Sequence, residues 1–78
     1  MAAKAFLLIE TVVGKSNEVV AAIRQLGEER VKWVGTVTGP YDVIAVLEGG
    51  TLPEIGELVT GKINSIAGIS RMTTCLVV

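Results

Sequence analysis

The segment Thr38-Gly39-Pro40-Tyr41-Asp42 gathers the residues best suited to bind a small molecule. Glycine lets a ligand approach backbone N–H groups closely, and such groups can hold a carboxylate. The Asp42 carboxylate could pair with an ammonium group of the same ligand. A hairpin turn in which Asp42 bonds its own local backbone explains the same residues. From the spacing alone, this turn is the favoured interpretation.

Few other side chains could carry chemistry. The chain has no histidine and one cysteine, which excludes histidine-based triads, histidine metal sites and an intrachain disulfide. Cys75 lies in the apolar segment Thr74–Val77, which favours a buried structural thiol over a reactive one. The glycines match no phosphate-loop spacing. We therefore expect no catalytic residue, no metal and no cofactor.

Three further sets of residues each allow a functional and a structural interpretation. Glu10 and Glu48 could act as paired carboxylates or lie solvated near strand ends. Trp33 could be a ligand platform or a packing residue. Thr73 and Thr74 could contact a ligand with their hydroxyl groups or fill a strand. The structural interpretation is favoured for each on sequence grounds.

Length and composition limit the class of protein. Seventy-eight residues fit one domain, spanning 1–78, and 50% hydrophobic content with 19% charged residues argues against disorder. The net charge of −1 offers no basic surface for nucleic acid. No apolar run approaches the roughly 18 residues of a membrane span, and no signal-peptide layout precedes the first strand. The single cysteine fits a cytoplasmic location.

Hydrophobic periodicity predicts six elements in the order strand–helix–strand, strand–helix–strand. Ser16 or Asn17 is expected to cap the first helix, and Thr51 with Glu54 forms a capping-box pattern before the second. Gly56 and Gly61 within the second helix are expected to allow close approach to the sheet or to a neighbour. The predicted strands are 4–13, 30–38, 42–48 and 69–77, and the predicted helices run from 16 to about 26 and from 51 to about 66.

This order predicts a ferredoxin-like α+β fold, βαββαβ, with a four-stranded antiparallel sheet in the order 4-1-3-2. Both helices then cover one face of the sheet. Both faces are apolar on the central strands, because Phe6 and Leu8 alternate with Ala5, Leu7 and Ile9, and Ile44 and Val46 alternate with Val43, Ala45 and Leu47. The face without helices is therefore apolar too. Such a face exceeds what soluble monomers usually expose. We therefore expect two copies to pair through their sheets into a dimeric α+β barrel.

The chain resembles the effector-binding domain of the Lrp/AsnC regulators, also called the RAM module, over nearly its whole length. The most specific part of the resemblance is Thr38-Gly39-Pro40-Tyr41-Asp42. The resemblance implies an oligomeric module that binds an amino acid and is linked to transcriptional regulation of amino-acid metabolism, without enzymatic activity. The other matching segments are Ala5–Ile9, Gly14-Lys15, Lys62–Ile69 and Thr74–Val77.

The resemblance also implies a ligand site and a set of partners. Thr38, Gly39, Tyr41 and Asp42 would form the hairpin part of the site. Thr73 and Thr74 would add hydroxyl groups. In the family, the two hydroxyl residues of this strand are often separated by one residue. In this chain, Met72 stands two positions before Thr74, and the second threonine, Thr73, is adjacent to it. Homodimers would assemble into octamer-like or decamer-like rings.

The first predicted strand begins at about Lys4, so we expect a stand-alone module without the helix-turn-helix domain of full-length members. Such a module would not bind DNA or membranes itself, and it could mix with full-length Lrp/AsnC regulators. Two alternatives remain open. One is a small enzyme of the dimeric α+β barrel type, and the other is a purely structural oligomerisation partner.

Overall fold

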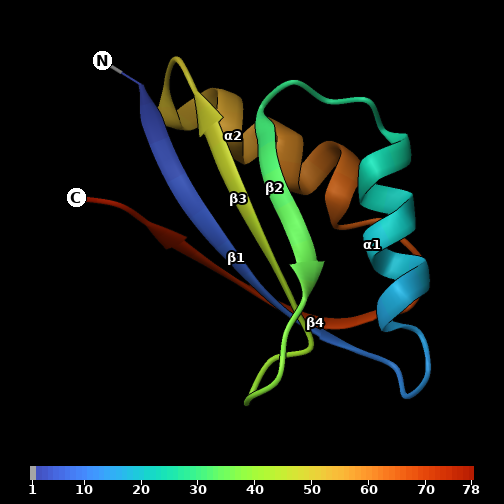
Figure 1. The fold of residues 1–78 in the computed structure, drawn as a ribbon. Coiled ribbons are helices and arrows are strands. Elements are labelled where there is room, and N and C mark those ends of the chain that lie inside the picture. Colours follow the sequence, from blue (N-terminus) through green and yellow to red (C-terminus); the bar gives the residue numbers. More distant parts are fainter. Residues whose placement is uncertain (1) are drawn as a thin grey trace.

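A computed structural model describes residues 2–78, and its elements follow the predicted order (Figure 1). Strand boundaries differ from the predicted ones by a few residues, chiefly because β1 and β2 end sooner. The elements are β1 (Ala3–Thr11), α1 (Ser16–Gln25), β2 (Val31–Thr36), β3 (Val43–Gly49), α2 (Leu52–Leu58), the π-helical turn η1 (Val59–Ile63) and β4 (Ile69–Leu76).

The four strands form one antiparallel sheet in the order β2-β3-β1-β4, which is the predicted order 4-1-3-2 read from the opposite edge. The central strand β1 pairs with β3 on one side and with β4 on the other. Both helices lie on the same face of the sheet (Figure 1). The ferredoxin-like prediction is therefore confirmed.

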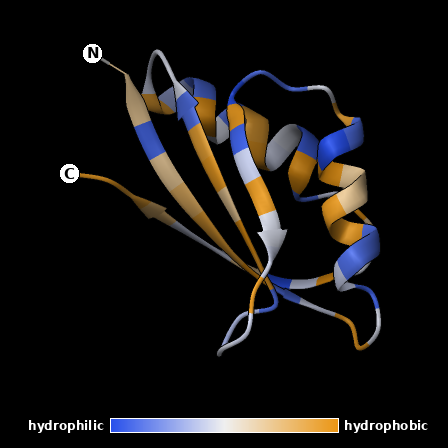
Figure 2. Cartoon of the chain, viewed as in Figure 1, coloured by the Kyte–Doolittle hydropathy of each residue, from blue (hydrophilic) through white to orange (hydrophobic). Residues whose placement is uncertain are grey.

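The core between sheet and helices is aliphatic. Alternate residues of β1, namely Ala5, Leu7 and Ile9, are completely buried, as the period of two in a half-covered strand requires. Figure 2 shows hydrophobic residues along most of β1 and β3. The other core residues are Val34, Val43, Ala45 and Leu47 from the sheet, and Val19, Val20, Ile23, Ile55, Leu58, Val59 and Ile63 from the helices.

The helix ends bear out part of the capping predictions. The Thr51 hydroxyl accepts the N–H of Glu54 at 3.3 Å, and the Glu54 carboxylate accepts the N–H of Gly50 at 3.0 Å. The capping box is thus present, with its return bond one residue earlier than expected. At α1 the prediction of a Ser16 or Asn17 cap is wrong. Lys15 is the N-cap, and the Ser16 hydroxyl contacts Thr11 instead.

The second helix differs from its prediction in shape and in the role of its glycines. The α-helix ends at Leu58 and continues as the π-helical turn η1. A Cβ atom added at Gly56 or Gly61 would meet nothing within 4 Å. Both glycines are exposed, so the expected close approach to the sheet is wrong.

The edge strand β4 is covered poorly on both faces. Cys75 pairs beside Phe6 on the face without helices and is exposed, so the prediction of a buried thiol is wrong for the single chain. Leu76 pairs beside Ala5 on the helix-bearing face, yet its side chain is 50% exposed. The reason is that α2 contacts β1 and β3, away from this edge.

The helix-free face of the sheet, called the open face below, has an apolar centre and charged ends. Cross-strand pairs place Phe6 beside Val46, and Leu8 beside Ile44. Each of these four side chains is only partly buried in the single chain. Lys4 pairs with Glu48 at one end of this face, which leaves the centre free of charge.

Candidate functional site

The loop that joins β2 to β3 carries the chemistry predicted from the sequence. The N–H of Val37 donates to the carbonyl of Asp42 at 2.9 Å and closes the hairpin. Gly39 has φ +154°, which favours glycine, and a Cβ atom there would meet nothing within 4 Å. The backbone of this loop is therefore open to a ligand at Gly39, while Thr38 and Pro40 beside it are exposed.

Asp42 is held at the base of the hairpin by a contact that neither sequence interpretation anticipated. Its carboxylate Oδ2 accepts the N–H of Thr11 at 2.8 Å, across 31 residues of chain. The Asp42 N–H donates to the carbonyl of Ile9 at 2.9 Å. The side chain therefore bonds a neighbouring strand and not its own local backbone. Within residues 2–78, its second oxygen, Oδ1, has no protein partner.

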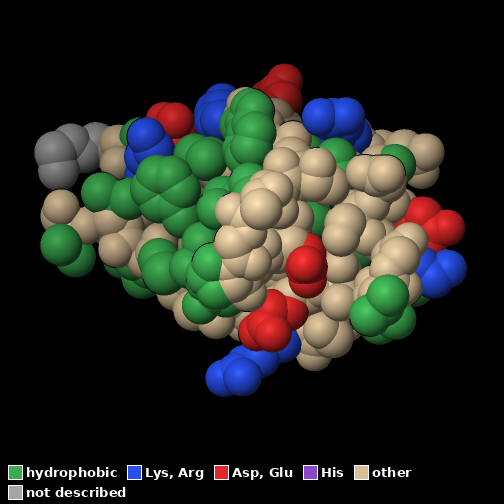
Figure 3. Space-filling model, turned by 60° about the horizontal axis from the view of Figure 1, so that its bottom comes forward, with side chains coloured by type: hydrophobic (Ala, Val, Ile, Leu, Met, Phe, Trp, Pro, Cys, Tyr) green, Lys and Arg blue, Asp and Glu red, His purple; other side chains and the backbone are tan. Residues whose placement is uncertain are grey.

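Tyr41 stands next to Asp42 and is partly buried. Together, Tyr41, Asp42 and the open backbone at Gly39 combine an aromatic surface, a carboxylate and backbone N–H groups within four residues. Figure 3 brings this end of the molecule forward and shows carboxylate side chains near its middle, with hydrophobic side chains gathered toward the side of the termini. This arrangement can bind a ligand that carries both a positively and a negatively charged group.

Thr73 and Thr74 do not join the hairpin within one chain. Thr73 pairs with Leu8 and Thr74 with Leu7, so their side chains lie on opposite faces of β4. Strand β1 separates β4 from β3, which places these residues two strands away, or roughly 10 Å across the sheet. Both threonines are exposed.

The β4 residues that do lie level with the hairpin are Ser70 and Arg71. Arg71 pairs with Glu10 across the strands, with 3.9 Å between Nε and Oε2, and the Ser70 hydroxyl donates to the Glu10 carbonyl at 3.1 Å. Glu48 lies opposite Lys4, about 20 Å from Glu10 along the strands at roughly 3.3 Å per residue. Glu10 and Glu48 are therefore not paired carboxylates.

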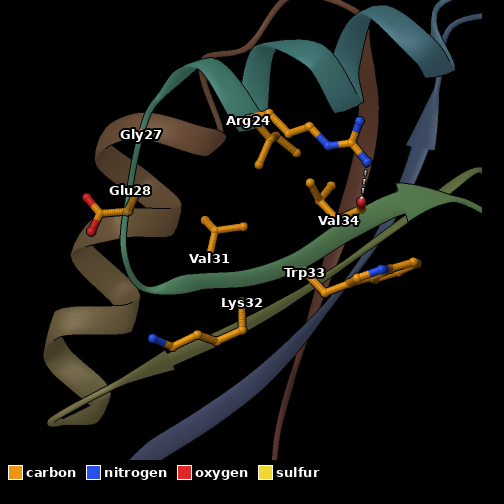
Figure 4. A pocket seen from close by; sticks show the side chains of 8 residues that line it. Arg24, Gly27, Glu28, Val31, Lys32, Trp33 and Val34 are labelled. Carbon is orange, nitrogen blue, oxygen red and sulfur yellow. Dashed lines mark hydrogen bonds between the residues drawn. The ribbon is translucent and has the colours of Figure 1, made fainter.

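A separate hollow of about 320 Å³ lies between the end of α1 and the edge strand β2 (Figure 4). Its lining combines apolar residues, among them Ile23 and Val34, with the charged residues Arg24 and Lys32. The Arg24 guanidinium donates to the carbonyl of Val34 at 3.2 Å and so occupies part of the strand edge. Trp33, for which the sequence allowed a ligand platform or a packing role, also lines this hollow, and its side chain is exposed.

Glu28, beside that hollow, is the centre of an ion-pair cluster. Its carboxylate accepts from Arg30 Nε at 2.8 Å and from Lys62 Nζ at 3.1 Å. Hydrogen bonds from Arg30 and Lys62 lower the pKa of Glu28 from 4.5 to about 2. Arg30 also donates to the carbonyl of Glu54 at 3.0 Å. The cluster joins the α1–β2 loop to the second helix, far from the hairpin.

Two other kinds of functional feature are missing from the described part of the chain. Residues 2–78 contain no group of three histidine, cysteine, aspartate or glutamate side chains that could hold a metal ion. Within the same residues, no helix is long and apolar enough to span a membrane.

The fold and the hairpin define a class of protein, a small ferredoxin-like domain whose polar, ligand-competent groups gather at one end of the sheet. The family to which the chain belongs follows from its sequence. It is a member of the Lrp/AsnC ligand binding domain family, whose model matches residues 4–78. A comparison with curated proteins found no match.

Solved structures of similar sequence share the fold over nearly the whole chain. The hypothetical protein PHS023 from Pyrococcus horikoshii is 32% identical, with a TM-score of 0.84, and the match covers 100% of this chain and 90% of that one. TTHA0845 from Thermus thermophilus is also 32% identical, with a TM-score of 0.87 and coverage of 97% and 92%.

Two longer proteins have the same fold over about half of their length. AsnC from E. coli is 17% identical with a TM-score of 0.87, and the match covers 97% of this chain but 50% of that one. The regulator NMB0573 from Neisseria meningitidis, solved as a complex with L-Met, is 16% identical with a TM-score of 0.79 and coverage of 97% and 49%. At these identities the likeness concerns the fold alone.

Proposed function

We propose that this chain is an oligomeric module that binds an amino acid and is linked to transcriptional regulation of amino-acid metabolism. One observation carries the proposal: in a member of a ligand binding domain family, an unobstructed glycine and a partly buried carboxylate lie together on one hairpin. The complex of NMB0573 with L-Met supports an amino acid as the class of ligand.

In the proposed site, the two ends of an amino acid meet opposite charges. The backbone N–H groups near Gly39 receive the α-carboxylate, and the Asp42 carboxylate receives the α-ammonium group. A charge-assisted hydrogen bond of this kind contributes roughly 1.5–3 kcal/mol. Thr38 and Tyr41 border the same space. This division suits an α-amino acid better than a simple amine or a simple acid.

The proposed site is completed by a second copy of the chain. Thr73 and Thr74 lie two strands from the hairpin of their own chain, so we propose that they reach the ligand from a neighbouring subunit. Dimers form through the open face, and dimers join into octamer-like or decamer-like rings. The apolar centre of the open face, with Phe6, Leu8 and Val46, supports the first of these steps.

The proposed partners are proteins of the same family in the cytoplasm. Mixing with full-length Lrp/AsnC regulators would let the module transmit the presence of its ligand to transcription. The chain has seven basic and eight acidic residues, so we expect it to bind no DNA directly. The proposed role is non-enzymatic.

A thermal-shift screen of the twenty amino acids tests the proposal. A ligand present at 100 times its dissociation constant stabilises the protein by about 2.7 kcal/mol, which raises the melting temperature measurably. Isothermal titration calorimetry then gives the affinity of each positive amino acid. Binding of one or a few amino acids supports the proposal. If none binds at millimolar concentration, a purely structural oligomerisation role replaces it.

A further inference from the structure

Asp42 makes hydrogen bonds in two directions from the base of the hairpin. Its carbonyl accepts the N–H of Val37 at 2.9 Å, which closes the hairpin. Its N–H donates to Ile9, and its carboxylate Oδ2 accepts from Thr11 at 2.8 Å. One residue therefore fixes the hairpin loop to two points of β1, on either side of Glu10.

The contact with Thr11 gives a backbone N–H of β1 a hydrogen-bond acceptor that the neighbouring strand does not supply. Regular pairing of β1 with β3 ends at Ile9 and Val43. On the other side, Glu10 pairs with Arg71 and Thr11 with Ile69, so the register with β4 shifts and Ser70 is left over. A partly buried N–H without an acceptor destabilises a fold. The Asp42 carboxylate supplies that acceptor where the main chain of β3 no longer does.

The Thr11 end of the contact is itself held by other elements. The Thr11 and Ser16 hydroxyl oxygens lie 2.9 Å apart, which ties this point to the start of α1. The next residue, Val12, donates its N–H to the carbonyl of Gly68 at 2.8 Å. The carboxylate of Asp42 thus bonds a point that α1 and the segment before β4 also support.

We infer that Asp42 is a positioning residue of the hairpin site as well as its proposed ligand contact. Its bond to Thr11, called the Asp42–Thr11 latch below, holds the hairpin in place with Oδ2 and leaves Oδ1 available to a ligand. A single free oxygen suits one N–H of an ammonium group, whereas a guanidinium group often binds a carboxylate through both oxygens in parallel. This choice of ligand rests on the proposed function, but the latch itself does not.

Two variants of Asp42 separate the latch from the charge. Asp42→Asn keeps an oxygen that can accept the Thr11 N–H, but it replaces the negative charge and the second oxygen. Asp42→Ala removes both. We expect hydrogen exchange of the Thr11 amide, measured by NMR, to rise about 10-fold in Asp42→Ala, the factor expected for one lost hydrogen bond. In Asp42→Asn it should stay within about threefold of the wild type.

The affinity for the amino acid, measured by calorimetry, should follow the charge and not the latch. We expect it to fall about 10- to 150-fold in both variants, because each removes a charge-assisted hydrogen bond. Glu54→Ala is the matched control. It removes another carboxylate that accepts a backbone N–H, that of Gly50, and should leave the Thr11 amide and the affinity unchanged.

The outcomes distinguish the latch from the proposed function. Equal protection of the Thr11 amide in wild type and Asp42→Ala, or equal loss in both variants, overturns the latch. Unchanged affinity in Asp42→Asn overturns the ligand contact but not the latch. If no amino acid binds the wild type, the ligand contact is likewise overturned and the latch is unaffected.

A measurement on the wild type covers the case in which Asp42→Ala does not fold. A coupling through the hydrogen bond, from the Thr11 amide nitrogen to the Asp42 side-chain carboxyl carbon, should then be detectable in isotope-labelled protein. Its absence in a well-resolved spectrum also overturns the latch.

Discussion

At the scale of the residue, Glu28 holds together segments that are far apart in the chain. Its carboxylate is bonded by Arg30 from its own loop and by Lys62 from η1. Because the folded-state pKa of Glu28, about 2, lies below its ordinary value of 4.5, the ionised carboxylate stabilises the folded state. This contribution is fully present above about pH 4.5 and is lost as the pH falls through about 2.

We therefore predict that Glu28→Gln lowers stability at pH 7 and that the difference from the wild type shrinks as the pH falls from 4.5 toward 2. Urea unfolding at fixed protein concentration, at pH 7, 4.5 and 2.5, measures this difference. Glu29→Gln is the control, because Glu29 is exposed and has no ion-pair partner within residues 2–78. A difference that stays constant over this pH range would contradict the prediction.

The residue scale also marks the limit of sequence reasoning at the site. Gly39, Tyr41 and Asp42 could be singled out because their side chains, or the lack of one, signal turn and ligand chemistry. The role of Thr11 could not, because its backbone N–H makes the contact and every non-proline residue carries one. The identity of Asp42 suggested a ligand or its own local backbone as the partner, and neither is the Thr11 N–H.

At the scale of the element, the alternation along each central strand separated its two faces, but it could not show which face the helices cover, because both are apolar. In the structure the covered set of β1 is Ala5, Leu7 and Ile9. The error on Cys75 arose because apolar neighbours do not show which face of the sheet a residue lies on. Cys75 lies beside Phe6 on the open face, where no helix covers it.

A substitution of Gly56 tests whether this position of α2 is free of contacts, as it is in the single chain. A Cβ atom there meets nothing within 4 Å, so Gly56→Ala should stabilise the protein by about 0.5–1 kcal/mol through lower backbone entropy of the unfolded chain. Thermal and urea unfolding measure the gain. A loss of stability would indicate that Gly56 packs against a neighbouring subunit.

Gly68→Ala is the contrasting variant. Gly68 has φ +99°, and its Cβ would lie 3.1 Å from Val19 Cγ2 and 3.2 Å from Lys15 Cβ. Alanine there must adopt an unfavourable conformation and push these neighbours aside. We expect a loss of more than about 1 kcal/mol. A neutral result would show that the loop before β4 can rearrange.

At the scale of the whole molecule, the open face predicts obligate association. Leu8 lies at its centre, between Ile44 and Thr73. Leu8→Asp would bury an unpaired charge in a sheet-to-sheet dimer, which costs several kcal/mol. Sedimentation and circular dichroism should show a dissociated or unfolded protein. Asn17→Asp adds the same charge at an exposed position of α1, and this variant should behave as the wild type.

A folded monomer of the wild-type chain at micromolar concentration would contradict the predicted dimer. It would also mean that the partly buried Phe6, Ile44 and Val46 need no partner surface. In that case the proposed ring, and the contribution of Thr73 and Thr74 from a neighbouring subunit, would fall with it.

The charge of the whole chain gives one more prediction. With a net charge of −1, the protein alone should show no saturable binding to duplex DNA in a gel-shift titration. Salt of about 50 mM makes the test lenient, because phosphate contacts are strongest at low ionic strength. Binding below micromolar concentration would contradict it.

The position of β1 between β3 and β4 has a consequence for the making of the protein. β1 is the first of the described strands to be synthesised, and its second pairing partner, β4, is the last. Until Ile69–Leu76 leaves the ribosome, one edge of β1 remains unpaired, and Leu7 and Ile9 lie next to that edge. A chain that still lacks β4 therefore has an incomplete apolar sheet, and the sheet can be completed only after β4 has emerged.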